Sequence, residues 1–451
     1  MPAGASFRMR RMEFSVGTGL RVRVLVTNTR CQQAYAIMAS LRPHAERIVV
    51  TTYGRHRLAA ALAPPARSRL VDASYRVPTP PVPWLEPGPT PRERHYVEAL
   101  LAICRRESLD LIMPSRDEVA YILARHRDRF IERGTAVPVC DFPVQARLTD
   151  KWESIQAAKQ AGIPVPQTHL VRSWSELEEA LADVGLPAVV KPRLGSGGQG
   201  LHYILSSQQI RQLRRTTALA PGDVLVQEYI PGTMPVNSRT AYLVMSPDGR
   251  CPAMFPLMRL RCALWHVGIP YAALVSLDDS TVRSQSLRLL RSLAWWGSAC
   301  LEWKRDPRDG RTKLLDANAR MGASVSAACA AGVDLPLILA KVTLGMEVEP
   351  EVSGVAGRLH YDPVMEVLSA VTYLANRLAR RVRGPHAPPP ADMVPPLPIW
   401  LRGFTRFGRV GRRTTSDHWR ALARDPLPPI LHWLEQAVFV CRRWRGFLSH
   451  R

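Results

Sequence analysis

The chain has 451 residues, of which 46% are hydrophobic and 22% are charged, as in an ordinary globular protein with room for two or three domains. Its formal net charge of +23 comes almost wholly from arginine, since only six of its 61 basic residues are lysines. The arginines are spread along the whole length, which argues against a nucleic-acid surface outside the C-terminal region.

Cysteine spacing and apolar runs exclude further classes. The eight cysteines lie far apart without a Cys-x-x-Cys pair, which predicts neither a zinc site nor a disulfide framework and favours a reducing cytosol. No apolar run reaches the roughly 18–20 residues of a membrane span. Residues 1–20 are basic and lack a signal-peptide core, so we expect a disordered leader. The expected location is cytoplasmic, with the inner membrane face as an alternative site of peripheral attachment.

Strands and helices alternate after the leader. The expected elements are strands over 21–26, 48–52 and 109–113, with helices ending near Leu41 and Arg106. This alternation predicts a β-α-β start and an open parallel sheet. The turn over 114–118 follows the last strand, so it either contacts a ligand at the carboxyl edge of the sheet or caps the next helix.

A glycine-rich stretch, residues 189–205, contains Gly195, Gly197 and Gly200 in the spacing G-x-G-x-x-G of a dinucleotide site. A dinucleotide loop opens directly into a helix. Here the glycines are followed by residues 201–205, an aromatic and branched run that favours a strand. We therefore predict a strand–glycine loop–strand hairpin that folds over phosphates as a flap, and not an NAD site.

The remaining elements mix helices and antiparallel strands. They are helices over 151–161, 173–182, 281–296 and 324–331, strands over 187–191, 224–230, 240–245 and 251–261, and a hairpin over 300–318. We expect Thr149 and Asp150 to cap the first of these helices.

The predicted hairpin brings oxygen-bearing side chains together. If its turn lies at 306–310, Glu302 is opposite Asp316 or an immediate neighbour, and Asp316 and Asn318 share a face. Two carboxylates and an amide oxygen suit Mg²⁺, whereas the alternative is a solvated hairpin face. Arg320 would point the same way if the strand continues, and could neutralise charge during phosphoryl or acyl transfer.

The order of these motifs resembles the ATP-grasp superfamily, closest in texture to the carboxylate–amine ligases and the carbamoyl-phosphate synthetase-like group. The resemblance rests on Asp150-Lys151, Val190-Lys191-Pro192 with the glycine flap, residues 226–230, Glu302, and residues 316–320. It implies a mixed α/β and α+β fold. The implied divisions are a leader over 1–20, a Rossmann-like pre-ATP-grasp domain over 21–145, a two-lobed ATP-grasp domain over 146–350 with a glycine-flap lobe at 165–230 and a metal and catalytic lobe at 231–350, and a basic, Pro-rich, helical tail over 351–451.

The resemblance also implies residue roles around ATP. Lys151 and Lys191 would reach the phosphates, and Arg320 with Arg259 or Arg261 would steady the γ-phosphate and an acyl-phosphate. Phosphate-binding backbone in the flap and the adenine-binding hinge would come from Ser196, Gly197, Gly198 and Gly200, and from Gln227, Glu228, Tyr229 and Ile230. Mg²⁺, with Mn²⁺ as an alternative, would be held by Glu302, Asp316 and Asn318.

Two positions depart from the family pattern. Asp316 stands where the family usually has Glu, so metal geometry or affinity can differ. Residues 233–235, Thr-Met-Pro, stand where many members carry an acid for the ribose hydroxyls. Neither departure removes the phosphate or metal motifs.

The implied activity is an ADP-forming ligase that activates a small carboxylic acid as an acyl-phosphate for attack by an amine. The alternatives are an ATP-dependent phosphotransferase and a non-catalytic protein that binds ATP or an anionic surface. We expect acid and amine substrates and no nucleic acid. The loop over 264–271 is a candidate substrate contact, although Trp265 and His266 there are equally consistent with packing.

The tail lies outside the resemblance. Residues 355–451 carry 16 arginines against six acids, with a proline-rich linker over 385–398. Apolar residues follow at helical spacing, namely Leu431, Leu434, Val438 and Cys441. This stripe predicts an amphipathic helix that packs on the protein's own core or on a partner subunit, as in a homodimer, or that lies on an anionic membrane.

Overall fold

The computed structural model describes most of the chain between residues 21 and 383. The described residues are 21–28, 31–53, 68–84, 88–195, 197–198, 200–216, 224–232, 237–264, 269–349, 351–383, 438 and 440. Several predicted features lie outside the described residues: the leader, Ser196, residues 233–235, Trp265, His266, the proline-rich linker and most of the tail stripe.

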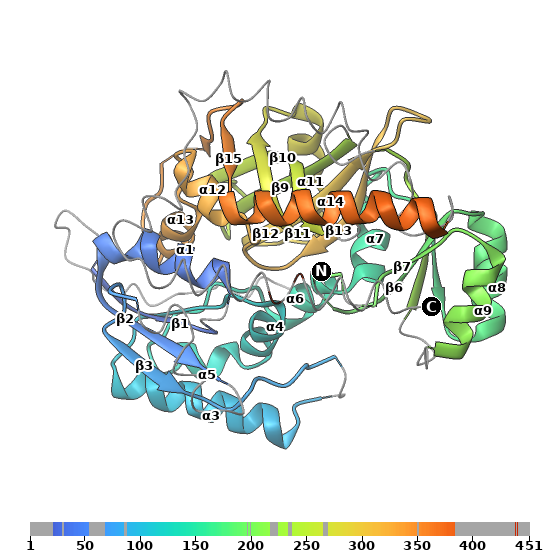
Figure 1. Ribbon diagram of the computed structural model, residues 1–451. Helices are drawn as coiled ribbons and strands as arrows, with labels where there is room; N and C mark the ends of the chain where they lie inside the picture. The colour runs from blue at the N-terminus through green and yellow to red at the C-terminus, as the bar shows by residue number, and fades with distance from the viewer. Residues whose placement is uncertain are drawn as a thin grey trace.

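A parallel sheet forms the N-terminal part, as predicted, and its strand order is β3-β2-β1-β4 (Figure 1). Strand β3 was not predicted from the sequence. Its strands are β1 (Val22–Val26), β2 (Ala45–Thr52), β3 (Ala73–Arg76) and β4 (Leu111–Met113). Its helices are α1 (Gln32–Leu41), a 3-10 turn η1 (Arg42–His44), α3 (Pro91–Arg106), α4 (Asp117–Arg125), α5 (Arg127–Ile131) and α6 (Phe142–Thr149). Four of the five residues in β1 are buried, as expected for a parallel strand covered on both faces.

A small antiparallel sheet follows, in the order β5-β8-β6-β7. It comprises β5 (Thr168–Val171), β6 (Ala188–Pro192), β7 (His202–Ile204) and β8 (Val224–Glu228). Its helices are α7 (Lys151–Gln160), α8 (Trp174–Val184) and α9 (Ser207–Thr216). The glycine loop joins β6 to its antiparallel neighbour β7, so the predicted hairpin is confirmed and the dinucleotide arrangement is excluded.

A large sheet completes the fold, in the order β13-β12-β9-β10-β11-β15, with β14 beside β10. Its strands are β9 (Ser238–Met245), β10 (Ala253–Leu264), β11 (Ile269–Ser276), β12 (Gly297–Arg305), β13 (Thr312–Asn318), β14 (Val352–Ser353) and β15 (Leu359–Tyr361). Its helices are α11 (Ser280–Ser292), α12 (Val325–Ala330), α13 (Leu335–Thr343) and α14 (Pro363–Arg383). Because β14 and β15 join this sheet, the predicted boundary at residue 350 divides a continuous structure.

Local sequence explains several helix starts. Asp150 accepts hydrogen bonds from the backbone of Trp152 and Glu153 and so caps α7, as predicted. Ser173 caps α8 through Glu176 N, and Thr90 caps α3 ahead of a proline at the first position. These caps fix where each helix begins, and the α7 cap thereby places Lys151 at a helix N-terminus.

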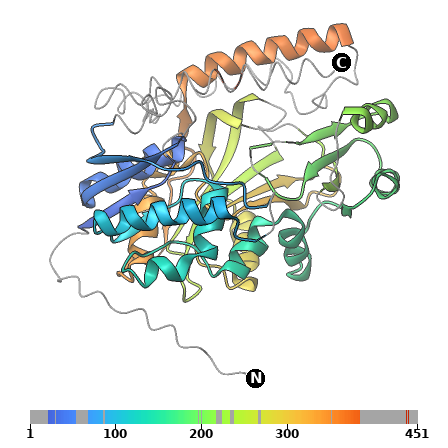
Figure 2. The same cartoon turned by 90° about the horizontal axis from the view of Figure 1, so that it is seen from below.

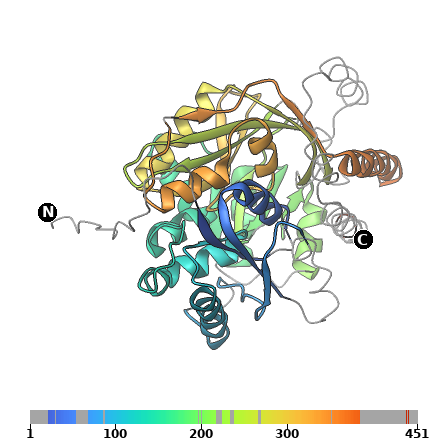
Figure 3. The same cartoon turned by 90° about the vertical axis from the view of Figure 1, so that its left-hand side faces the viewer.

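One hydrophobic cluster joins the first sheet to the large sheet. Ile37 and Met38 of α1 share it with Leu339 of α13 and Phe255 of β10. Figure 3 shows α1 lying beside α12 and α13, between the two sheets. The N-terminal part is therefore packed onto the large sheet through an apolar contact, which holds the carboxyl edge of β1 and β4 near the β12–β13 hairpin.

The long helix α14 crosses the outside of the large sheet (Figure 1). Beyond it, Val438 of the predicted tail stripe is half exposed, whereas Val440, which is not in that stripe, is buried against Met365, Ala263 and Ala272. Within the described residues, no helix is both long and apolar enough to span a bilayer.

Phe130 and Ile131 offer a matched test of the first core. Phe130 is fully buried in α5, whereas its neighbour Ile131 is exposed. We expect Phe130→Ala to lower the free energy of unfolding by about 3–5 kcal/mol because it leaves a cavity. Ile131→Ala should change it by about 0.5 kcal/mol or less. Urea unfolding monitors both; equal effects would contradict the packing described for α5.

Candidate functional site

The candidate site is built on the β12–β13 hairpin. Glu302 of β12 pairs directly with Asp316 of β13, as the sequence predicts. Asn318, two residues further along β13, pairs with Cys300. The Glu302 and Asp316 side chains are 32% and 23% exposed, so both can meet a ligand while remaining partly shielded from water. Their pairing brings the two predicted carboxylate ligands together.

Lys191 reaches this hairpin from the small sheet. It lies on β6, its side chain is buried, and its Nζ donates to the carbonyl oxygen of Leu315 at 2.9 Å. The pKa of Lys191 is lowered to about 8: burial is the largest cause and nearby Lys151 adds to it, while Asp316 and Glu302 act in the opposite direction. A lysine so placed carries a positive charge that is only partly neutralised by its surroundings.

Lys151 approaches the same strand from the N-terminus of α7. Its Nζ donates to Gly195 O at 2.7 Å and lies 3.6 Å from Asp316 Oδ1. Arg193, just after β6, pairs with the capping residue Asp150 at 2.7 Å. These contacts join α7, the glycine loop and β13, so the two predicted lysines meet at the predicted carboxylates.

Arg259 of β10 pairs with Glu302 of β12 at 2.9 Å, across the intervening strand β9 of the large sheet. Burial acts to raise the pKa of Glu302, but Arg259, with Arg320 and Lys191, outweighs it and holds that pKa below its ordinary value. Glu302 is therefore ionised near neutral pH. The pKa of Arg259 is raised: burial acts to lower it, but the charge of Glu302 outweighs that effect.

Arg261 contacts a different carboxylate from Arg259. Its guanidinium makes a bidentate pair with Glu366 of α14, with Nε 2.7 and 2.9 Å from the two carboxylate oxygens. The β10–β11 register shifts on both sides of Arg261, which breaks the two-residue alternation with Arg259. Of the two alternative arginines, Arg259 is thus the one that contacts Glu302, whereas Arg261 is paired with Glu366.

Arg320 links the hairpin to the first sheet. Its Nη2 lies 3.3 Å from Asn318 Oδ1, and its Nε lies 3.0 Å from Asp117 Oδ2 at the start of α4. The turn over 114–118 makes no side-chain cap at Arg116. The turn is joined to the site through the Asp117–Arg320 pair, and its predicted contact with a ligand stays a prediction.

The glycine loop shows why its residues are glycines. Gly197, Gly198 and Gly200 have φ between 65° and 69°, a region that side chains rarely adopt. A Cβ on Gly200 would also lie 2.6 Å from Pro192 Cγ. Ser196 lies outside the described residues.

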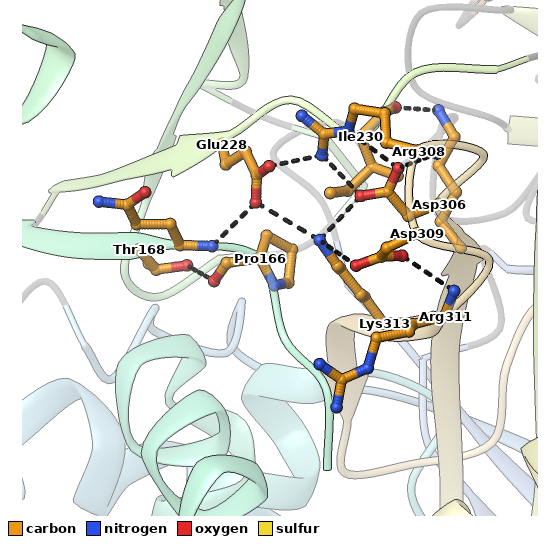
Figure 4. A network of polar contacts seen from close by, with 11 residues as sticks. Pro166, Thr168, Glu228, Ile230, Asp306, Arg308, Asp309, Arg311 and Lys313 are labelled. Atoms are coloured by element: carbon orange, nitrogen blue, oxygen red, sulfur yellow. Dashed lines mark hydrogen bonds and ion pairs between the residues drawn. The ribbon is translucent and has the colours of Figure 1, made fainter. Parts of the chain in front are cut away.

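The predicted hinge after β8 is held by lysines that sequence reasoning missed. Lys304 donates to Ile230 O at 2.6 Å and lies over the Tyr229 ring, 5.0 Å from its centroid. Glu228 is paired with Lys313 and Arg308, as Figure 4 shows. The remaining hinge residue, Gln227, is buried and donates to Thr168 Oγ1 at 3.0 Å.

Asp306 closes this network from the β12–β13 turn. Hydrogen bonds from Arg308 hold its pKa far below the ordinary value, and Lys313, 2.8 Å away, adds to the shift (Figure 4). The scarcity of lysine in the sequence could have revealed these contacts. Four of the six lysines lie at the junction of the small and large sheets, namely Lys151, Lys191, Lys304 and Lys313.

The donor set fits a divalent cation. Asp316 Oδ1 is buried and accepts no hydrogen bond from any described residue, so it has coordination capacity to spare. Among the described residues no group of three or more His, Cys, Asp or Glu side chains is placed to hold a metal ion. Two carboxylates and an amide nevertheless suit Mg²⁺, which uses few protein ligands and completes its shell with phosphate and water.

A family model of the ATP-grasp domain matches residues 156–256. The chain therefore contains an ATP-grasp domain. The matched segment includes Lys191, the glycine loop and the hinge, whereas the carboxylates lie beyond it.

Curated relatives point to the same group. The chain is similar to the carbamoyl phosphate synthase large chain of Methanobrevibacter smithii, 25% identical over 41% of this chain and 18% of that protein. It is also similar to the formate-dependent phosphoribosylglycinamide formyltransferase of Shewanella frigidimarina, 31% identical over 30% of this chain and 34% of that protein. The chain thus spans about a fifth to a third of the length of these two relatives.

Solved ATP-grasp structures share the fold. The biotin carboxylase domain of Hydrogenobacter thermophilus 2-oxoglutarate carboxylase, in complex with MgADP, matches with a TM-score of 0.56 at 15% identity, covering 74% of this chain and 72% of that chain. N5-carboxyaminoimidazole synthetase from Staphylococcus aureus, complexed with ADP, matches with a TM-score of 0.55 at 13% identity, covering 73% and 79%. At these identities the likeness establishes the fold.

The Arg261–Glu366 pair gives a test of how α14 is attached. Both side chains are largely buried, so Glu366→Gln leaves a guanidinium without its counter-charge and should lower the free energy of unfolding by about 3 kcal/mol. The control is Glu98→Gln in the exposed Arg129–Glu98 pair, expected to cost less than about 1 kcal/mol. Urea unfolding measures both; a similar small loss in each would refute the buried pairing.

Proposed function

We propose that this protein is an ADP-forming ligase that activates a small carboxylic acid with ATP and joins it to an amine. The observation that carries the proposal is the meeting of Lys151 and Lys191 with Glu302 and Asp316, from segments far apart in the chain. The ATP-grasp domain and similarity to carbamoyl phosphate synthase large chains support the same chemistry.

In this scheme the chain mainly positions charge. Lys151, Lys191 and the backbone of the glycine loop would hold the ATP phosphates, with the hinge at residues 227–230 against the adenine. Glu302, Asp316 and Asn318 would hold Mg²⁺, which when bound offsets phosphate charge and aligns the oxygens. Arg320, oriented by Asp117 and Asn318, would face charge that develops on the transferred group.

The proposed reaction consists of two successive displacements. A carboxylate oxygen of the acid attacks the γ-phosphorus, and the bond to the β–γ bridging oxygen breaks to release ADP. The amine nitrogen then attacks the carbonyl carbon of the acyl-phosphate. Phosphate leaves with the electron pair of the C–O bond, and the nitrogen loses a proton. Exclusion of water by the glycine loop would protect the acyl-phosphate from hydrolysis.

Hydroxylamine trapping tests the reaction class. With ATP, Mg²⁺ and a panel of amino and hydroxy acids, we expect the cognate acid to stimulate ADP release and to form a hydroxamate. Asp316→Asn should lower this rate by about 100-fold or more, because it removes a charge from the reacting centre. The exposed control Glu132→Gln should retain it. ADP release with a phosphorylated product and no hydroxamate would favour the phosphotransferase alternative and refute the ligase.

The lowered pKa of Lys191 predicts that nucleotide affinity depends on pH near 8. Its ammonium attracts phosphate below its pKa of about 8 and is neutral above it, so affinity falls as pH rises through 8. Linkage to one proton limits the rise in the ATP dissociation constant to about tenfold per pH unit. Isothermal titration calorimetry measures this constant.

Three variants separate charge from packing at this position. Lys191→Ala should weaken ATP binding at pH 7, whereas Lys191→Arg should remove the pH dependence near 8 because arginine stays charged. The exposed Lys159→Ala serves as the control and should behave as the unmodified chain. Full affinity in Lys191→Ala would contradict this assignment.

A further inference from the structure

The helix α14 carries apolar side chains on the face directed away from the protein. Its inner face is buried on the large sheet through Met365, Ser369, Thr372 and Tyr373. On the opposite side, four apolar residues are 64%, 52%, 63% and 64% exposed, in the order Val367, Val371, Leu374 and Leu378. Their spacing of four, three and four residues aligns them in one stripe along the helix.

The stripe is a continuous patch rather than a scatter of single exposed residues. A surface helix ordinarily places its polar residues on the side opposite the core, so apolar residues at four successive positions of that side indicate a contact surface. Figure 2 shows α14 along the upper margin of the molecule, and Figure 3 shows it projecting at the side. Since its four residues are each more than half exposed, the stripe is accessible to a partner.

Charge identifies the partner. Arg377 lies exposed beside Leu374 and Leu378, and its Nη1 also donates to Tyr373 Oη at 3.2 Å. In the sequence, 15 arginines stand against four acidic residues from residue 377 to 451. Val440 of this basic segment packs against Met365 in the first turn of α14. An apolar stripe with a basic border matches an anionic surface.

We propose that the outer face of α14, formed by Val367, Val371, Leu374 and Leu378, is a docking surface for an anionic lipid bilayer. The helix lies in the plane of the headgroups, with the stripe in the acyl boundary and the arginines at the phosphates. A second copy of this chain fits less well, because two surfaces of the same positive sign would meet. The proposal does not depend on the ligase activity.

Vesicle flotation of the full chain tests this surface. The probes are phosphatidylcholine vesicles with and without about 30% phosphatidylglycerol. We expect binding to the anionic vesicles, weakened by salt, and little binding to the neutral ones. Val371→Glu with Leu374→Glu should lower the partition coefficient by about tenfold or more, since apolar contact is lost and repulsion added.

Controls distinguish the stripe from the arginine-rich segment. Ile131→Glu, at an exposed apolar position of α5, should bind as the unmodified chain. Leu374→Gln with Leu378→Gln adds no charge and should still weaken binding, and unchanged urea unfolding would show that each variant folds. Equal binding by the α14 variants, equal binding to neutral vesicles, or a dimer that these substitutions dissociate without any vesicle binding would each overturn the proposal.

Discussion

The burial of the Lys191 ammonium between two sheets is the constraint on which the rest of the site depends. Lys191 projects from β6 of the small sheet and donates to the Leu315 carbonyl on β13 of the large sheet. A charge removed from water is costly unless counter-charge lies close. Glu302 and Asp316 supply it and thereby keep the pKa near 8 instead of lower. The site is therefore stable as it stands, yet retains positive charge that a polyanion would neutralise.

Lysine side chains connect the two sheets in both directions. Lys191 runs from the small sheet to the large one, whereas Lys304 runs from β12 of the large sheet to the Ile230 carbonyl beyond β8 of the small sheet. Lys313 adds a second link from β13, to Glu228. Contacts at both ends of the β6–β8 pair fix the hinge and the glycine loop relative to the carboxylates. Positioning of this kind is what phosphoryl transfer asks of a protein.

Local features of the sequence were enough to predict the hairpin and the flap, but not the contacts that turn them into a site. The turn Asp306–Gly310 fixes the Glu302–Asp316 register, and the aromatic run after Gly200 marks a strand. The bulge that separates Arg259 from Arg261 has no such local mark. Arg320 and Asp117 lie 203 residues apart, so their contact follows from the packing of α1 on α13. Strand β11 was missed because its start was interpreted as part of a substrate loop.

The distribution of lysine and arginine follows from their chemistry. Arginine keeps its charge at any accessible pH and forms forked pairs, as Arg261 does with Glu366. In this chain it supplies nearly all the positive charge. Lysine is a compact charge on a flexible stem, and burial moves its pKa readily. Four of the six lysines in this chain lie at one junction, where each extends a single donor to a carbonyl or carboxylate oxygen. An arginine at Lys191 would preserve the charge but not the single 2.9 Å contact to Leu315, because its planar fork directs several donors at once.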